Sequence, residues 1–209
     1  AFAAAIQLIG SLLLDIRLAL WLMVAWTWLA LMSKEFFVHA WLKRHPIFYM
    51  LSHMVIMPVF DIYATACDWL PQGGGWHRGL GWFLAVSYLN GIVIEIGRKI
   101  RTPADEEEGV ETYSVLWGRP KALAAWLTAM GLTALCAFCG ARLISFEKPV
   151  AVLLLLLLIW AGLETAGILS KPDPGRGRRI ELISGVWTLV MYLSLGALPL
   201  VLRAMGGAG

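Results

Sequence analysis

A run of acidic and basic side chains separates two strongly apolar segments of the chain. It occupies residues 90–121, reads NGIVIEIGRKIRTPADEEEGVETYSVLWGRPK, and places Glu95 four residues before Lys99. Residues at this spacing share one face of a helix, so we expect these two side chains to pair. Carboxylates are hard oxygen ligands for Mg²⁺, which keeps several waters and is shared with substrate phosphates. Neighbouring Arg and Lys would then neutralise the remaining phosphate charge. From charge alone, a solvated acidic loop explains the run equally well.

Other carboxylates lie in or near the apolar segments. Glu35, Glu164 and Glu181 lie within about two turns of predicted helix ends, whereas Asp61 lies farther inside. Ionisable groups within a membrane usually face the bundle interior or a cavity and are candidates for function. Structural roles are also open: Glu181 can interact favourably with the positive end of a helix dipole, and Asp61 can be a structural hydrogen-bonding group. Glu164, among Leu and Ala, is the hardest to explain structurally.

The composition is that of a membrane protein. Hydrophobic residues make up 59% of the 209 residues, charged residues make up 15%, and the mean hydropathy is +0.73. Soluble domains carry about 25% charged residues. Eleven Trp are typical of the aromatic belts at membrane interfaces. The net charge is only +3, so nucleic acid is not an expected partner, whereas membrane lipid is.

The three cysteines do not predict a disulfide framework, because their number is odd and the chain is apolar. Cys136 and Cys139 form a C-x-x-C pattern, but no His or acid lies near them in the sequence. We interpret them as small packing residues rather than as a redox or metal pair.

Apolar runs of about 20 residues, the length that a bilayer requires, organise the whole chain. Backbone groups in lipid must be satisfied internally, so these runs are expected to be helices. The sequence therefore predicts an all-α, polytopic transmembrane helix bundle that forms a single domain over residues 1–209. The predicted spans are 18–38, 47–70, 79–97, 120–142, 149–169 and 180–202.

The first apolar run, residues 2–14, is too short to be a complete span. A helix of that length reaches only about 20 Å, whereas the hydrocarbon core is about 30 Å thick. The chain also opens at Ala1 rather than at Met. We therefore expect the bundle to be N-terminally truncated, with an upstream segment missing or supplied by a partner chain.

Most of the 17 basic residues lie in alternate loops, 34–46, 98–121 and 170–179. The positive-inside rule predicts that these three loops are cytoplasmic and that the protein is a multi-pass protein of the plasma or inner membrane. The basic residues of these loops are Lys34, Lys43, Arg44, Arg98, Lys99, Arg101, Arg119, Lys121, Lys171, Arg176, Arg178 and Arg179.

Two of these loops resemble the UbiA superfamily of intramembrane prenyltransferases. The second aspartate-rich region of that family is similar to Asp105, Gly109, Thr112 and Val115-Leu116-Trp117-Gly118, and its basic LKR-x-P loop is similar to Leu42-Lys43-Arg44-His45-Pro46. The resemblance covers nearly the whole chain and corresponds to about helices three to nine of a nine-helix fold. The family's first aspartate-rich motif is absent from this sequence.

The resemblance implies transfer of an isoprenyl group from a diphosphate donor to an aromatic or other lipid-soluble acceptor, with Mg²⁺ as the cofactor. It assigns Glu95, Asp105 and Glu108 to the metal. It assigns the diphosphate, or another lipid-linked phosphate, to Lys43, Arg44, Arg98, Lys99 and Arg101. Tyr88, Asn90 and Glu164 would border the acceptor pocket. Because Glu95 stands where the family has Asp and is followed by basic residues, phosphate binding chiefly through the basic side chains is an open alternative.

Three other functions remain open at this level. A relative that transfers a phosphosugar to a polyprenyl phosphate would need a similar charged loop. A transporter or permease would use Asp61 and Glu164 as an ion path, although the acids gather at one face and no internal repeat is visible. A catalytically silent fragment would require a partner segment.

Overall fold

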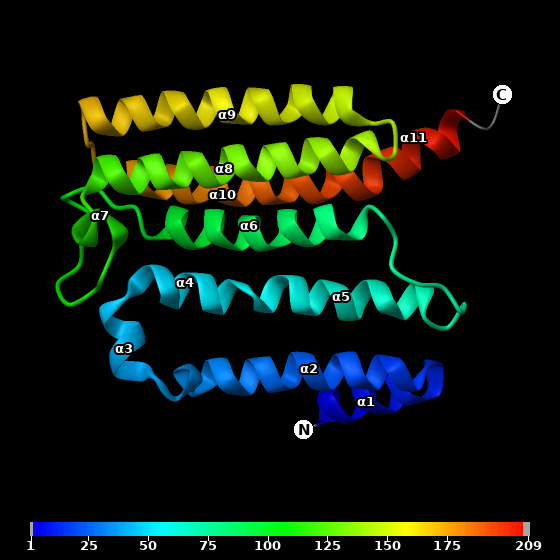
Figure 1. The fold of residues 1–209 in the computed structure, drawn as a ribbon. Coiled ribbons are helices and arrows are strands. Elements are labelled where there is room, and N and C mark those ends of the chain that lie inside the picture. The colour runs from blue at the N-terminus through cyan, green and yellow to red at the C-terminus, as the bar shows by residue number, and fades with distance from the viewer. Residues whose placement is uncertain (1, 207–209) are drawn as a thin grey trace. The chain divides into compact units, whose positions relative to one another are not determined.

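The computed structural model describes residues 2–206, and within them every regular element is helical (Figure 1). This confirms the prediction of an all-α fold. Among these residues, six stretches are long and apolar enough to cross a membrane. They are Ile16–Ser33, Pro46–Trp69, Leu80–Arg98, Arg119–Arg142, Glu147–Ser170 and Arg176–Met205, close to the six predicted spans.

The chain divides into two compact units, the first ending at Tyr88 and the second beginning at Leu89. The boundary lies within helix α6 (Leu80–Arg98). Each unit has its own helix contacts and is described by itself.

In the first unit, α1 (Phe2–Leu14) and α2 (Ile16–Ser33) meet at Asp15, whose side chain caps α2 by accepting a hydrogen bond from the Arg17 amide. The Ser11 hydroxyl lies 2.9 Å from Tyr63 Oη, which joins α1 to α5 (Ile56–Trp69). Leu18 of α2 is buried in a core with Ala66 and Leu70. This short N-terminal pair of helices is thereby fixed to α5.

Helix α2 ends at Ser33, although the apolar pattern predicted a span to residue 38. Glu35, Phe36 and Phe37 have φ angles of 47°, 52° and 59°, a left-handed conformation that L residues seldom adopt and that cannot continue a right-handed helix. The chain then enters α3 (His39–Arg44), which carries the predicted basic loop.

The predicted span 47–70 is interrupted near its centre. It consists of α4 (Pro46–Met54) and α5, which begins at Ile56. Pro58 has no amide hydrogen to donate to the carbonyl of Met54, and its ring crowds that carbonyl. The break at Val55 is therefore the expected response of a helix to an internal proline.

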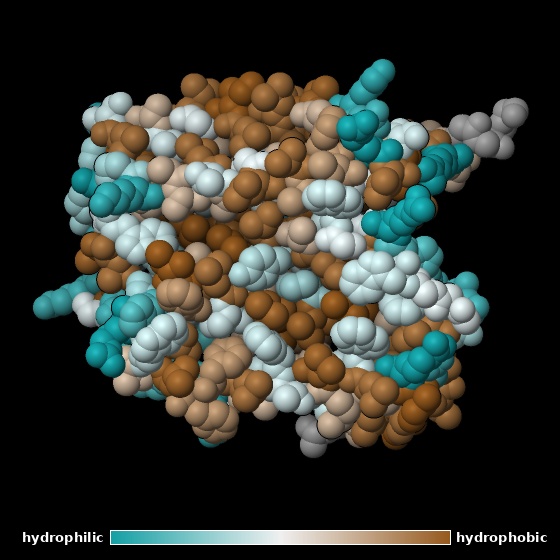
Figure 2. All heavy atoms as spheres, viewed as in Figure 1, coloured by the Kyte–Doolittle hydropathy of each residue, from teal (hydrophilic) through white to brown (hydrophobic). Residues whose placement is uncertain are grey.

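In the second unit, α9 (Glu147–Ser170) packs against both α8 (Arg119–Arg142) and α10 (Arg176–Tyr192) (Figure 1). Helix α10 begins before the predicted residue 180, and the chain continues through a π-helical segment, Leu193–Ala197, into α11 (Leu198–Gly206). The outward face of α9 is apolar, with Leu155, Leu156 and Leu163 each more than half exposed. Figure 2 shows apolar side chains along α9 and hydrophilic ones near the helix ends.

The tightest packing of this unit is around Gly97, near the end of α6. The Trp126 indole on α8 donates a hydrogen bond of 2.9 Å to the Ser184 hydroxyl on α10, and that hydroxyl donates to the Ile180 carbonyl. A Cβ on Gly97 would overlap Ser184 Oγ and would lie 3.2 Å from Trp126 Nε1. Only glycine therefore allows the three helices to approach this closely.

Replacing Gly97 by Ala should lower the free energy of unfolding by about 1–3 kcal/mol, because the added methyl group overpacks this contact. Thermal unfolding followed by tryptophan fluorescence in detergent micelles measures the change. Gly131→Ala on α8 is the matched control, since nothing lies within 4 Å of a Cβ at that position. The double variant Gly97→Ala/Ser184→Ala should recover part of the loss. Equal unfolding midpoints for Gly97→Ala and Gly131→Ala would contradict the packing argument.

Candidate functional site at the charged end of the second unit

The acidic and basic loop that follows α6 folds back onto the end of that helix. The Tyr113 amide donates to the Lys99 carbonyl at 3.0 Å, and the Arg101 amide donates to the Ser114 hydroxyl at 2.8 Å. Thr112 caps the short helix α7 (Tyr113–Leu116) and also donates its hydroxyl to the Glu106 carboxylate, 2.8 Å from Oε2. These bonds fix the loop at the end of the apolar helices.

Glu95 is almost completely buried, with 7% of its surface exposed. Its Oε1 lies 2.9 Å from Lys99 Nζ, and its Oε2 lies 2.7 Å from Arg98 Nη2. The predicted pair between Glu95 and Lys99 is thus confirmed. Lys99 also lies over the Tyr113 ring, 5.3 Å from its centroid, a favourable cation–π distance. Both Glu95 oxygens are therefore occupied by cationic side chains.

Asp105 connects the loop to the turn between α9 and α10. Its Oδ2 accepts from the Thr102 hydroxyl at 2.7 Å and from the Gly175 amide at 2.9 Å. The bond from Thr102, then the bond from Gly175, hold the pKa of the Asp105 carboxyl below its ordinary value, and the nearby positive charges of Arg101 and Arg178 act in the same direction. The carboxylate is thus ionised and fixed between two segments.

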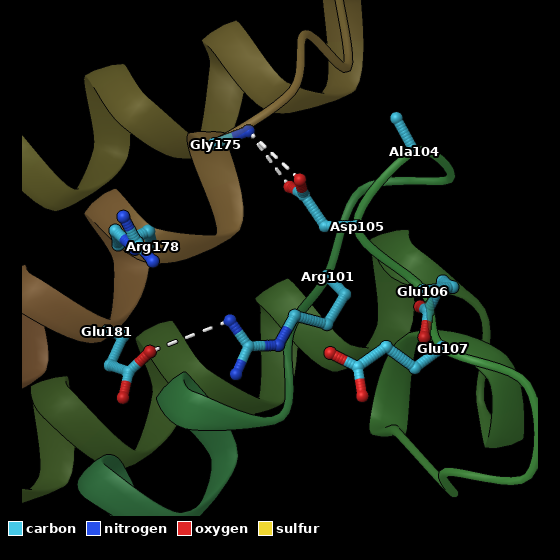
Figure 3. Close-up of a pocket in the computed structure, with 8 residues that line it drawn as sticks. All are labelled: Arg101, Ala104, Asp105, Glu106, Glu107, Gly175, Arg178 and Glu181. Carbon is cyan, nitrogen blue, oxygen red and sulfur yellow. Dashed lines mark hydrogen bonds and ion pairs between the residues drawn. The ribbon is translucent and has the colours of Figure 1, made fainter.

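A pocket of about 540 Å³ opens beside this contact, formed by the loop and the start of α10 (Figure 3). The guanidinium of Arg101 lies on one side, 3.6 Å from the Glu181 carboxylate on α10. Its lining residues are Arg101, Ala104, Asp105, Glu106, Glu107, Gly175, Arg178 and Glu181. Because carboxylates outnumber guanidiniums, the pocket suits a phosphate that is accompanied by a cation better than a bare anion.

The metal ligands that the resemblance implies are not gathered at one point. Within residues 2–206, no group of three or more His, Cys, Asp and Glu side chains is placed to hold a metal ion. Glu95 is paired with two cations, Asp105 accepts other hydrogen bonds, and Glu108 is exposed and does not line the pocket. The donor set still suits a Mg²⁺ ion shared with substrate phosphates, because such an ion needs only one or two protein carboxylates. Magnesium stays a prediction.

Of the predicted phosphate-binding residues, Arg101 lines the pocket, whereas Arg98 and Lys99 lie on α6 and its end, paired with Glu95. Lys43 and Arg44 are exposed on α3 in the first unit, where the Arg44 guanidinium donates to the Ala40 carbonyl. The part of Lys43 and Arg44 in phosphate binding therefore stays a prediction.

The three residues predicted to border an acceptor pocket have different surroundings. The Tyr88 hydroxyl donates to the Leu51 carbonyl within the first unit. Asn90 is fully buried, and both polar atoms of its amide are without a partner in the part of the chain that the structure describes. Glu164 lies 3.4 Å from the guanidiniums of both Arg176 and Arg179. Glu164 is thus a charge-balancing group near the end of α9, whereas Asn90 is one of several buried polar groups without a partner among the described residues.

The pocket contains residues that the sequence interpretation did not assign to it, chiefly Gly175, Arg178 and Glu181 at the start of α10. The basic run from Arg176 to Arg179 was a visible signal, but it predicted only a cytoplasmic loop. Its proximity to Asp105 depends on a contact between residues 70 positions apart.

Replacing Glu95 by Gln should lower the free energy of unfolding, because it leaves Arg98 and Lys99 without their counter-charge. The expected loss is about 1–3 kcal/mol, between the values typical of exposed and of buried ion pairs. Thermal unfolding in detergent measures the loss. Glu111→Gln is the control, since Glu111 is exposed in the same loop and forms no ion pair within residues 2–206. Equal midpoints for the two variants would show that the ion pairs do not stabilise the fold.

The lowered pKa of Asp105 predicts how its contribution to stability depends on pH. A carboxyl whose pKa is lower in the folded state stabilises that state fully above its unfolded value, near 3.8, and loses this effect as pH falls through the folded value. The difference in unfolding midpoint between wild type and Asp105→Asn should therefore be constant from about pH 8 to pH 5 and shrink only in stronger acid. A difference that disappears near neutral pH would contradict the hydrogen-bonded geometry.

Comparisons of the chain with protein-family models, with curated proteins and with solved structures found no match.

Proposed function

We propose that the chain is an integral membrane enzyme of the prenyltransferase kind, which binds a lipid-linked diphosphate at the charged end of its second unit. The observation that carries this proposal is the pocket in which Arg101 and Arg178 face a set of carboxylates. It lies beside the end of α6, one of the apolar helices long enough to span a membrane. A substrate with a charged head and an apolar chain matches both parts of this arrangement.

The proposed reaction creates negative charge where the pocket holds positive charge. The bond between the isoprenyl carbon and the diphosphate oxygen breaks, a bond to the acceptor forms, and the acceptor loses a proton to solvent. The departing diphosphate gains charge, which the guanidinium groups of the pocket would stabilise more strongly than they stabilise the bound donor. A bound Mg²⁺ would supply further positive charge to the same phosphate oxygens.

The arrangement of the loop supports a role in binding rather than a freely solvated acidic segment. Glu106 is held by Thr112, and Asp105 is held by Thr102 and Gly175. Carboxylates held in this way lose little conformational entropy when a ligand binds, which favours affinity. We also propose that this charged end faces the cytoplasm. The proposal rests only on the distribution of basic residues among the loops.

Purified protein in nanodiscs should bind radiolabelled farnesyl diphosphate, and binding should increase when Mg²⁺ is added and fall when it is chelated. Arg101→Gln should weaken binding about tenfold or more, the effect of losing a hydrogen bond to a charged group. The control is Arg142→Gln, because Arg142 ends α8 at its other end, away from the pocket.

Two results would overturn the proposal. One is the absence of farnesyl diphosphate binding in a sample with intact helical circular dichroism. The other is equal weakening by Arg101→Gln and Arg142→Gln. Binding of a radiolabelled polyprenyl phosphate, without binding of farnesyl diphosphate, would instead favour the phosphosugar transferase, which shares the phosphate chemistry.

A further inference from the structure

We infer that Arg178 is a phosphate-binding residue of the pocket and that Asp105 is a positioning residue, which holds the turn carrying Arg178 against the loop. This inference rests on the proposed function, since it concerns the same site. It assigns part of the phosphate site to the start of α10, which the resemblance to prenyltransferases did not include. It also gives Asp105 a role other than that of a metal ligand.

The charges around the turn distinguish Arg178 from its neighbours. Arg176 and Arg179 both lie 3.4 Å from Glu164, so their guanidiniums are directed to α9. Arg178 is exposed, lines the pocket, and forms no ion pair with a carboxylate in the described part of the chain. Its planar guanidinium therefore retains the donors that bind a phosphate in a bidentate manner.

Helical spacing explains why Arg178 lies in the pocket. Residues three apart share a helix face, and Glu181, three residues after Arg178, lines the same pocket. Gly177 lies between Arg176 and Arg178. It is packed so closely that an added Cβ would lie 2.7 Å from the Ile100 carbonyl oxygen. This contact fixes the rotation of α10 relative to the end of α6, where Arg178 and Arg101 line the same pocket (Figure 3).

Asp105, in the loop after α6, binds the turn that precedes α10 through its carboxylate. Gly175 precedes α10 with a φ of 79°, and no side-chain hydrogen bond caps the helix. The Gly175 amide instead donates to Asp105, at 2.9 Å from Oδ2 and 3.2 Å from Oδ1. Because Oδ2 also accepts from Thr102 within the loop, the carboxylate joins the two segments of the site. An Asn whose Oδ1 lies in the place of Oδ2 can accept the bonds from Thr102 and Gly175 that end there, whereas an Ala cannot.

The test uses the full chain in nanodiscs and measures the dissociation constant of radiolabelled farnesyl diphosphate and the Mg²⁺ concentration that gives half-maximal binding. Arg178→Gln should weaken binding about tenfold or more, and Arg179→Gln, the matched control, less than about twofold. Asp105→Ala should weaken binding as much as Arg178→Gln does. Asp105→Asn should remain within about threefold of wild type, with an unchanged Mg²⁺ midpoint. The double variant Asp105→Ala/Arg178→Gln should bind no more weakly than either single variant.

Specific results would overturn the inference. Equal losses for Asp105→Asn and Asp105→Ala, with a raised Mg²⁺ midpoint, would make Asp105 a metal ligand. Equal affinities for Arg178→Gln and Arg179→Gln would remove Arg178 from the site. Unchanged unfolding midpoints exclude misfolding as the cause of a loss.

A second probe separates failure of this inference from failure of the proposed function. Binding of inorganic pyrophosphate that is lost in Arg178→Gln, without binding of farnesyl diphosphate, would support the phosphate site and reject prenyl transfer. Absence of binding of both probes to wild type would overturn both proposals.

Discussion

The close approach of three helices at Gly97 determines the geometry of the charged end. Trp126 and Ser184 form one hydrogen bond across α8 and α10, and the missing side chain of Gly97 lets α6 pack against both. Gly177, at the start of α10, likewise packs directly against the backbone at Ile100, just after the end of α6. Since a packed interior does not deform continuously, these contacts define where α6 ends relative to where α10 begins. The pair Arg101–Glu181 and the bond from Gly175 to Asp105 depend on that spacing.

The distribution of polar groups is the one expected of helices apolar enough to cross a bilayer, whose core contains no water. Charged side chains of the second unit gather at the helix ends, and those nearest the interior are paired, as Glu95 is with Arg98 and Lys99. Uncompensated charges in such an environment would cost several kcal/mol each. Some buried polar atoms have no partner within residues 2–206, and Asn90 is a clear case, because it is fully buried and neither polar atom of its amide is paired. Such a group is expected to bind a water molecule or a ligand.

Helical spans were predictable because their hydrophobic length is a local property of the sequence. The pair of Glu95 and Lys99 was predictable for the same reason, since both residues lie on one helix. The end of α2 at Ser33 was not, because the residues that follow adopt left-handed angles with no glycine to signal it. Pro58 was a sequence signal for the interruption at Val55, but hydropathy alone does not detect it, because the apolar run continues through the proline.

The candidate site was predictable only in part. Arg101 and Asp105 were identified from the loop, but Arg178 and Glu181 enter the pocket through contacts between distant segments, which one sequence does not reveal. The resemblance implied Glu108 as a metal ligand, and this stays a prediction; its side chain is exposed and does not line the pocket.

The bond between Asp105 and Gly175 also bears on biogenesis. Two helices long and apolar enough to span a membrane, α8 and α9, separate these residues along the chain. During synthesis, the loop that carries Asp105 leaves the ribosome before its hydrogen-bond donor, the Gly175 amide, exists, and both helices must form before the two segments can meet. Assembly of the pocket is therefore a late event, and a nascent chain arrested before residue 175 contains the acidic loop without the turn that completes the pocket.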